Sequence, residues 1–162
     1  RLKPPGCFAG RPLRVQYSLM KIALTDETGE LDARYRARVK KIAGAVLREI
    51  EVDKASELSV TFIGDAEMRG LNKSWRGIDR ATDVLSFPQD GDGPVPLLGD
   101  IVISLDTTRR HAVRYDNTFH EEIKKLIVHG ILHLLGHDHK KKKEKEVMRG
   151  LEEELLGKIR EL

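Results

Sequence analysis

The chain has 162 residues, of which 40% are hydrophobic and 34% charged, a balance typical of a globular domain and not of a disordered chain. That length suffices for one domain with a hydrophobic core and is short for two. Lys and Arg number 29 against 26 Asp and Glu, so the formal net charge of +3 permits an anionic partner without requiring one.

The cysteine content and hydropathy indicate a compartment. Cys7 is the single cysteine, which excludes an intrachain disulfide and suits a reducing environment. No apolar run approaches the roughly 18 residues of a membrane span, and no basic-then-apolar secretory leader is recognisable. We therefore expect a cytoplasmic protein without a membrane partner.

The N-terminal stretch differs from the rest of the chain. Proline and glycine at 4–6 and 10–12 break regular structure, and Met20 looks like a natural start. We interpret residues 1–19 as an N-terminal extension and residues 20–162 as a single domain. The first strand is expected over at least Lys21–Leu24.

A helix and a strand follow. Apolar residues at helical intervals predict an amphipathic helix over Asp32–Ile50, with its basic residues on the solvated side. Alternation and β-branched residues predict a strand over Glu57–Ile63. Asp65 is expected to cap the N-terminus of a short helix that runs to about Trp75.

Four basic residues in and after this short helix are spaced by four, three and four: Arg69, Lys73, Arg76 and Arg80. A continuous helix would align them in one stripe. Gly77 is expected to break the helix and with it the stripe.

The middle of the chain predicts a hairpin. Thr82–Pro88 reads as a strand ended by proline, residues 89–96 as a loop, and Leu98–Ser104 as a strand that pairs with the first. A further helix is expected to begin at Asp106 or Thr107.

Two helices complete the chain. The capping box of Thr118 and Glu121 predicts a long, buried helix that begins after Asn117 or Thr118 and ends near Leu135. Glu144–Leu162 reads as a closing amphipathic helix. Its inward residues are expected to be Val147, Leu151, Leu155, Leu156 and Ile159.

The long helix carries a candidate metal site. His129 and His133 are four apart, so a helix places both imidazoles on one face, about 5–6 Å apart at Cβ. Gly136 suits a helix end, after which His139 can bring a third nitrogen to the same point. Three protein ligands leave a tetrahedral ion one open position, as in catalytic zinc sites.

The residues beside these ligands have open roles. His137 is expected behind the ligands or in solvent, and Asp138 fits equally well as a carboxylate that orients an imidazole or as a cap of the turn. Three imidazoles also suit copper, nickel and iron, so the spacing does not identify the metal.

The spacing of the histidines matches that of metzincin metalloproteases, with one departure. Those enzymes carry a glutamate, the general base, directly after the first histidine. Here that position is Gly130, so a protease mechanism would need its base from elsewhere.

Two blocks of sequence carry a family resemblance. They are HGILHLLGHDH at 129–139 and LNKSWRGIDRATDVLSFP at 71–88, joined by the strand LGDIVI at 98–103. The chain from about Met20 onward resembles the YbeY family of metal-dependent endoribonucleases. The resemblance implies an α+β domain in which a small mixed sheet of about four strands packs with about five helices and a core helix bears the metal.

The resemblance also implies a function. It identifies His129, His133 and His139 as ligands of one zinc ion, and Arg76 and His133 as catalytic residues. It implies a zinc-dependent single-strand endoribonuclease that acts in ribosomal RNA maturation, at the 16S rRNA 3′ end, and in ribosome quality control. The implied partners are ribosomal RNA and ribosomal particles, with ribosomal proteins or an assembly GTPase as further candidates.

Arg76 fits such chemistry because a guanidinium is planar, permanently charged and able to bind phosphate oxygens through two hydrogen bonds. The hypothesis is that the metal activates water or polarises the scissile phosphate while Arg76 stabilises the developing charge. The alternative for Arg76 is a surface ion pair with Asp79 or Asp83.

RNA contacts beyond the metal are less defined by the sequence. The basic run Lys140–Lys143 reads equally as a solvated segment or an RNA contact. Aromatic residues are few, and Trp75 and Phe87 are expected to be core or packing residues. Contacts to the RNA backbone should therefore dominate, with an affinity that falls steeply as salt rises.

Two other functions remain compatible with the sequence. One is a metal-dependent hydrolase of peptides or small molecules. The other is a non-catalytic ribosome-assembly factor in which zinc is structural.

Overall fold

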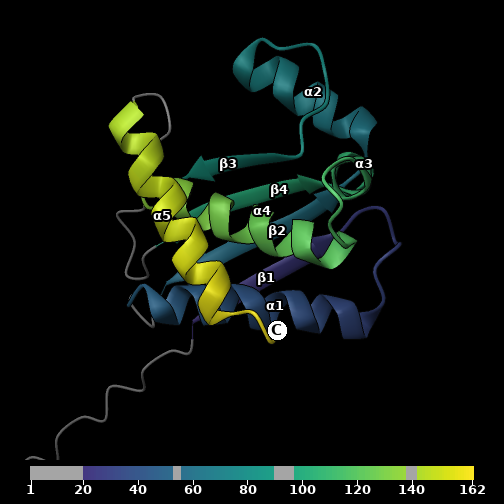
Figure 1. Cartoon of the computed structure of the whole chain (residues 1–162). Helices are drawn as coiled ribbons and strands as arrows, with labels where there is room; N and C mark the ends of the chain where they lie inside the picture. Colours follow the sequence, from purple (N-terminus) through teal and green to yellow (C-terminus); the bar gives the residue numbers. More distant parts are fainter. Residues whose placement is uncertain (1–19, 53–55, 90–96, 138–141) are drawn as a thin grey trace, which may run out of the picture.

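The computed structural model describes residues 20–52, 56–89, 97–137 and 142–162. Within these ranges the strands are β1 (Lys21–Asp26), β2 (Glu57–Ile63), β3 (Val84–Pro88) and β4 (Leu97–Ser104). The helices are α1 (Ala33–Glu49), α2 (Asp65–Arg76), α3 (Leu105–Arg114), α4 (Phe119–Leu134) and α5 (Lys142–Lys158). The predicted elements all form in the predicted order (Figure 1).

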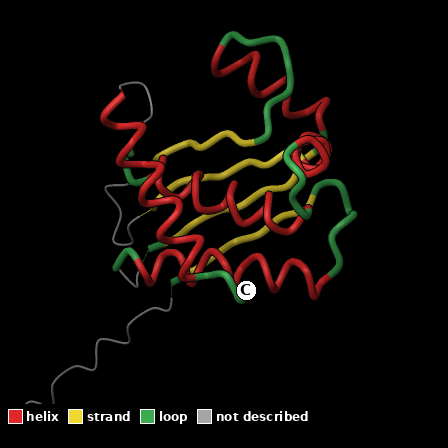
Figure 2. The backbone as a smooth tube through the Cα atoms, viewed as in Figure 1, coloured by secondary structure: helices red, strands yellow, loops and turns green. Residues whose placement is uncertain are grey.

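The strands form one mixed sheet in the order β1-β2-β4-β3 (Figure 2). β1 and β2 run parallel, as do β2 and β4, whereas β3 is antiparallel to β4 and pairs Val84 with Ile103. The predicted hairpin is therefore confirmed, and β3 lies at an edge of the sheet. The mixed sheet with five helices in the described ranges confirms the α+β class.

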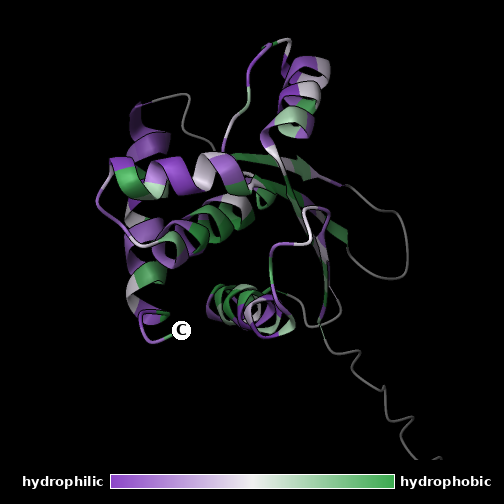
Figure 3. Cartoon of the chain, turned by 90° about the vertical axis from the view of Figure 1, so that its right-hand side faces the viewer, coloured by the Kyte–Doolittle hydropathy of each residue, from purple (hydrophilic) through white to green (hydrophobic). Residues whose placement is uncertain are grey.

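The main core lies between one face of the sheet and helices α1 and α4. α4 packs against β3, β4 and α1 on the inside and against α5 on the outside, which makes it the most enclosed helix (Figure 1). Figure 3 shows the hydrophobic residues gathered on the strands and on the helices packed against them. α4 is thus the core helix that the sequence predicted.

A smaller cluster forms on the opposite face of the sheet, under α2. Its buried residues are Ile63, Met68, Leu85 and Val102. Phe87, half-buried, packs against this cluster from β3. α2 itself lies beyond the edge strand β3, at the top of Figure 1.

Local signals at the ends of α4 behave as predicted. Thr118 and Glu121 form a complete capping box at its start. At its end Gly136 adopts a left-handed conformation, with φ of 88°, and its N–H donates to the His133 carbonyl. The N–H of His137 donates to the Leu132 carbonyl, which completes a Schellman motif.

Several predicted boundaries are wrong by a few residues. α3 begins at Leu105 with Ser104 as its N-cap, because the Ser104 hydroxyl accepts from the Thr107 N–H. β3 begins at Val84, and α5 spans Lys142–Lys158 in place of Glu144–Leu162.

One inward residue of α5 was also predicted wrongly. Val147 is 58% exposed, and its neighbour Met148 is buried instead. Met148, Leu155 and Ile159 are buried, while Leu151 and Leu156 are half-buried. Adjacent helical residues lie about 100° apart, so only one of Val147 and Met148 can face α4.

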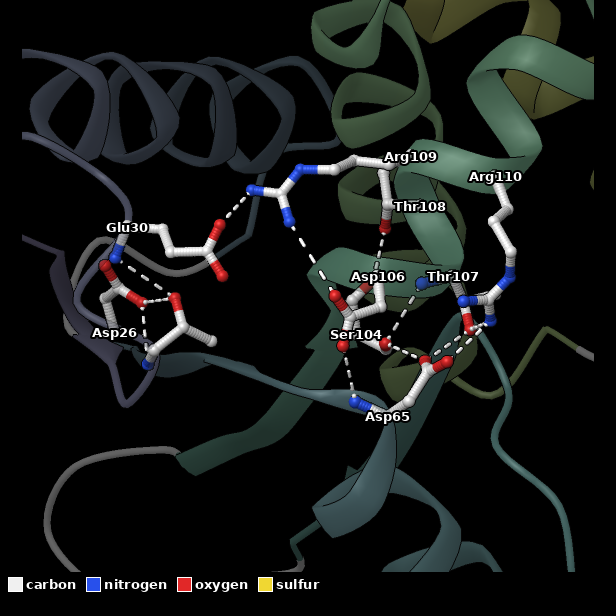
Figure 4. A network of polar contacts seen from close by, with 10 residues as sticks. Asp26, Glu30, Asp65, Ser104, Asp106, Thr107, Thr108, Arg109 and Arg110 are labelled. Carbon is white, nitrogen blue, oxygen red and sulfur yellow. Dashed lines mark hydrogen bonds and ion pairs between the residues drawn. The ribbon is translucent and has the colours of Figure 1, made fainter.

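The prediction that Asp65 caps α2 is wrong. Asp65 is the first residue of the helix, and Gly64 occupies the N-cap position without a side-chain hydrogen bond. The Asp65 N–H instead donates to the Asp106 carboxylate at 2.9 Å. In return, the Asp65 carboxylate accepts from the hydroxyls of Ser104 (2.6 Å) and Thr107 (2.7 Å) and pairs with Arg110 (2.7 Å). Figure 4 shows how these bonds join the N-termini of α2 and α3.

None of the helices in the described ranges is both long and apolar enough to span a bilayer.

The Asp65 network predicts a pH-dependent stability. Burial alone would raise the pKa of Asp65, but hydrogen bonds from Ser104, Thr107 and Arg110 to its carboxylate outweigh burial and lower the pKa. A lowered pKa contributes stability above the unfolded value of about 3.9 and loses it as the pH falls through the folded value. Asp65→Asn should therefore lower the free energy of unfolding by about 1–2 kcal/mol at pH 7, and by less below about pH 4.

Urea unfolding at several pH values measures this difference. Glu67→Gln is the matched control, because it removes the same charge from an exposed position in the same turn of α2. It should change stability by less than about 0.5 kcal/mol. An Asp65→Asn deficit that does not depend on pH would contradict the assigned role of the carboxylate.

Candidate functional site

A pocket of about 410 Å³ lies where α4, α5, β3 and the end of α2 meet. α4 contributes His129 and His133, and α2 contributes Arg76. The remaining lining residues come from two places. The segment at β3 supplies Thr82, Asp83, Val84 and Ser86, and α5 supplies Lys145, Met148, Arg149 and Glu152. The pocket thus gathers residues that are far apart in the sequence.

The two helical histidines share one face of α4, as predicted. Their ring centroids are 4.5 Å apart and the rings are inclined by 74°. The opposite side of α4 is buried against the sheet, so the helix that carries the imidazoles is held firmly in place.

Glu152 is a site residue that the sequence analysis missed. Its Oε1 lies 2.6 Å from Nδ1 of His129, and the two side chains are 27% and 32% exposed. A carboxylate at one ring nitrogen fixes the orientation of an imidazole and directs the other nitrogen, Nε2, to a ligand. The signal in the sequence was only that Glu152 lies four residues after Met148, on the same side of α5.

Two of the three predicted zinc ligands are therefore in one pocket, whereas His139 and Asp138 lie outside the described residues. Across the ranges that the structure describes, no three His, Cys, Asp or Glu side chains gather as a metal site. The donors that are placed fit a zinc ion, since they are imidazoles one helical turn apart with a carboxylate behind one of them. His137 is half-buried, its N–H closes α4, and it does not line the pocket.

Arg76, the last residue of α2, lines this pocket and is exposed. Among the described residues it forms neither of the ion pairs that were its alternative. Asp79 instead pairs with Arg69 at 2.6 Å and Lys73 at 3.1 Å, and Asp83 lies 3.4 Å from His111.

Gly77 ends α2 after Arg76, as expected, so Arg69, Lys73 and Arg76 lie in the helix while Arg80 lies beyond it. Gly77 adopts a left-handed conformation with φ of 70°. The chain then turns back, and Asp79 reaches Arg69 and Lys73. Arg69 and Lys73 thus pair with Asp79, whereas Arg76 lines the pocket.

Among the described residues, three cations and two carboxylates line the pocket. Arg76, Lys145 and Arg149 face Asp83 and Glu152, each of which has a histidine partner. The Arg149 pair with Glu153 is largely exposed on both sides and therefore weak. This balance favours an anionic ligand.

Trp75 differs from the expectation of a core residue, since it is 69% exposed. Its indole contacts Phe87 with ring centroids 5.3 Å apart. Phe87 is half-buried, as expected of a packing residue. Trp75 belongs to the last turn of α2, a helix that lies beyond the edge strand β3 (Figure 1).

Comparisons with known proteins bear on this arrangement. The sequence model of the endoribonuclease YbeY family matches residues 21–160. The chain belongs to the YbeY family. It is 38% identical to an endoribonuclease YbeY of Clostridium perfringens over 151 residues, which cover 80% of this chain and 90% of that protein. It is 39% identical to an endoribonuclease YbeY of Rhizobium etli over 155 residues, 91% of this chain and 90% of that protein.

A solved structure agrees with the fold of this YbeY family member. The solution structure of TM1509 from Thermotoga maritima superposes with a TM-score of 0.57 at 28% sequence identity, over 86% of this chain and 92% of that one. The family resemblance of the two sequence blocks is therefore confirmed.

Gly130 shows why this YbeY family member lacks a carboxylate beside its first histidine. A Cβ at position 130 would lie 2.8, 2.9 and 3.1 Å from three side-chain atoms of Ile101, which is fully buried in β4. The position faces the sheet, so a glutamate there would enter the core and not the pocket. The glycine permits α4 to pack closely on β4.

Gly130→Ala should therefore destabilise the fold. Overpacking costs about 1–3 kcal/mol, and the better helix propensity of alanine returns at most about 1 kcal/mol, so we expect a net loss of about 1–2 kcal/mol. Thermal and denaturant unfolding measure it. Gly150→Ala in α5, where an added Cβ meets nothing within 4 Å, should instead stabilise by about 0.5–1 kcal/mol. An equal increase in stability from both substitutions would show that the Ile101 side chain can move to make room for the added Cβ, against this prediction.

Proposed function

We propose that this YbeY family member is a zinc-dependent endoribonuclease that cuts single-stranded RNA, and that it acts in 16S rRNA 3′-end maturation and ribosome quality control. The name that its relatives share, endoribonuclease YbeY, supports RNA cleavage. The observation that carries the proposal is the meeting of the histidine pair and Arg76 in one pocket.

His129 and His133, with His139, would hold the zinc ion, and Glu152 would keep the His129 ring oriented toward it. When bound, the ion supplies a Lewis acid that polarises a phosphate oxygen and acidifies water.

The residues of the chain itself would bind and orient the phosphodiester. Arg76 donates two hydrogen bonds to phosphate oxygens and stabilises the charge that grows on them during attack. Lys145 and Arg149, on the α5 wall, attract the neighbouring phosphates of the strand. This division places the histidines at the reacting phosphate and the cations around it.

The same geometry weighs against peptide hydrolysis by a metzincin mechanism. That mechanism needs a general base directly after the first histidine, and position 130 faces Ile101 in the core. Phosphodiester hydrolysis depends more on charge stabilisation, which Arg76 can supply.

Metal removal tests the proposal. Zinc-loaded protein, a chelated sample and the His133→Ala variant are incubated with end-labelled single-stranded and structured RNA. We expect cleavage of the single-stranded RNA by the loaded protein, and at least about 100-fold slower cleavage by the other two, because both lose the Lewis acid.

Other results would favour the alternatives. Zinc-dependent digestion of casein or a peptide panel with intact RNA would indicate a peptide hydrolase. Binding to ribosomal particles without any RNA cleavage, with or without metal, would indicate an assembly factor with structural zinc. Cleavage that persists in both the chelated sample and His133→Ala would refute the role of the metal.

Arg76→Ala should lower single-turnover cleavage by about 10²- to 10³-fold, because a donor to the developing charge is lost. The zinc content, measured by atomic absorption, should stay unchanged. Arg80→Ala is the matched control: it removes an exposed arginine from the following loop, outside the pocket lining. Equal cleavage rates in the two variants would rule out the catalytic role of Arg76.

A further inference from the structure

We propose that Trp75 is a stacking platform that binds one nucleobase of the single-stranded RNA next to the phosphate held by Arg76. This inference rests on the proposed function, because RNA must be the ligand of the adjoining pocket. It replaces the expectation from the sequence that the indole is a packing residue.

The first support is the exposure of the side chain. Trp75 is the only tryptophan in the chain, and 69% of it is exposed to solvent. An indole is a large apolar group that usually contributes most when it is buried. Contacts with the other described residues therefore bury only a minor part of this side chain. Ile78, 41% exposed, extends the apolar surface just past the helix end.

The second support is that the ring is held in place before any ligand arrives. Phe87 meets the indole edge to face, with centroids 5.3 Å apart and planes inclined by 63°. Phe87 itself packs against the buried cluster that contains Leu85 and Val102. A ring braced on one side and open on the other can stack a base with little loss of side-chain entropy.

The third support is position. Trp75 directly precedes Arg76, and Phe87 directly follows Ser86, and both of these neighbours line the pocket. Successive side chains of a strand point to opposite faces, so Ser86 faces the histidines while Phe87 faces α2. Because β3 is an edge strand, the platform and the histidines lie on either side of that edge.

This arrangement suits a strand that crosses the edge of the sheet. Figure 1 shows α2 beyond β3, with α4 on the body of the sheet. A polynucleotide that leaves the pocket over β3 would place a phosphate at Arg76 and the attached base on Trp75. Arg69 and Lys73 are engaged by Asp79, so Arg76 is the α2 cation that faces the pocket.

The platform would also explain a preference for single strands. Every base has a π-face, so stacking on an aromatic ring tolerates any sequence. A base within a duplex already stacks on both sides and cannot reach the indole without leaving the helix. The site therefore favours unpaired nucleotides of any base.

A fluorescence titration tests the contact. The full zinc-loaded chain is titrated with single-stranded heptadeoxyadenylate, which offers the bases and phosphates without the 2′-hydroxyl, and with an abasic oligonucleotide of equal length. Because Trp75 is the sole tryptophan, its emission reports this ring alone. We expect quenching by heptadeoxyadenylate and none by the abasic strand. Equal quenching by both, or no quenching by either, overturns the proposal; in the latter case the exposed ring is better explained as a protein-docking residue.

Binding of labelled heptadeoxyadenylate to variants gives the second measurement. Trp75→Ala should bind about 5- to 150-fold more weakly than the wild type, and Trp75→Phe should retain most of the affinity. The control Val113→Ala removes an apolar residue of α3 that is 85% exposed, and should bind as the wild type does. Thermal unfolding verifies that each variant is folded. Binding of Trp75→Ala within twofold of the wild type would overturn the platform.

The two proposals can fail separately. If RNA is cleaved but the indole emission is not quenched, the stacking proposal fails and the nuclease proposal stands. If RNA is not cleaved but the quenching depends on the bases, the nuclease proposal fails and the protein has a nucleic-acid-binding surface at Trp75.

Discussion

Helix α4 packs tightly on strand β4 at Gly130, where the missing side chain leaves room for Ile101. This contact sets the depth and rotation of α4 on the sheet. With Gly130 turned to the sheet, His129 and His133 lie about 100° and 60° from it around the helix, and both line the pocket beside the edge strand β3. The site therefore depends on a packing contact made by a residue with no chemistry of its own.

The other two walls of the pocket are formed by α5 and the end of α2. α5 packs on the outer side of α4 with Met148 buried, and Glu152 of α5 contacts His129 of α4. α2 is joined to the start of α3 because the Asp65 N–H donates to Asp106 and the Asp65 carboxylate accepts from Ser104. The far end of α2 carries Trp75 and Arg76. Three helices with separate anchors thus converge on one cavity.

Charge is distributed unequally over these walls. Arg69 and Lys73 share the single carboxylate of Asp79, whereas Arg76 lines the pocket together with the α5 cations. The carboxylates in the lining, Asp83 and Glu152, each have a histidine partner. The pocket cations can therefore attract a polyanion, while Glu152 still orients the His129 imidazole.

The sequence by itself determined what depends on neighbouring residues: the order and type of the elements, the capping box at Thr118, the helix ends at Gly77 and Gly136, and the shared face of His129 and His133. Such features follow from hydrogen bonds and periodicities within a few residues. Only the tertiary structure decided that Glu152 meets His129, that Arg76 lines the same pocket and that Trp75 stays exposed. These outcomes require the relative placement of α2, α4 and α5, which comes from contacts between residues far apart in the chain, and no local pattern encodes it.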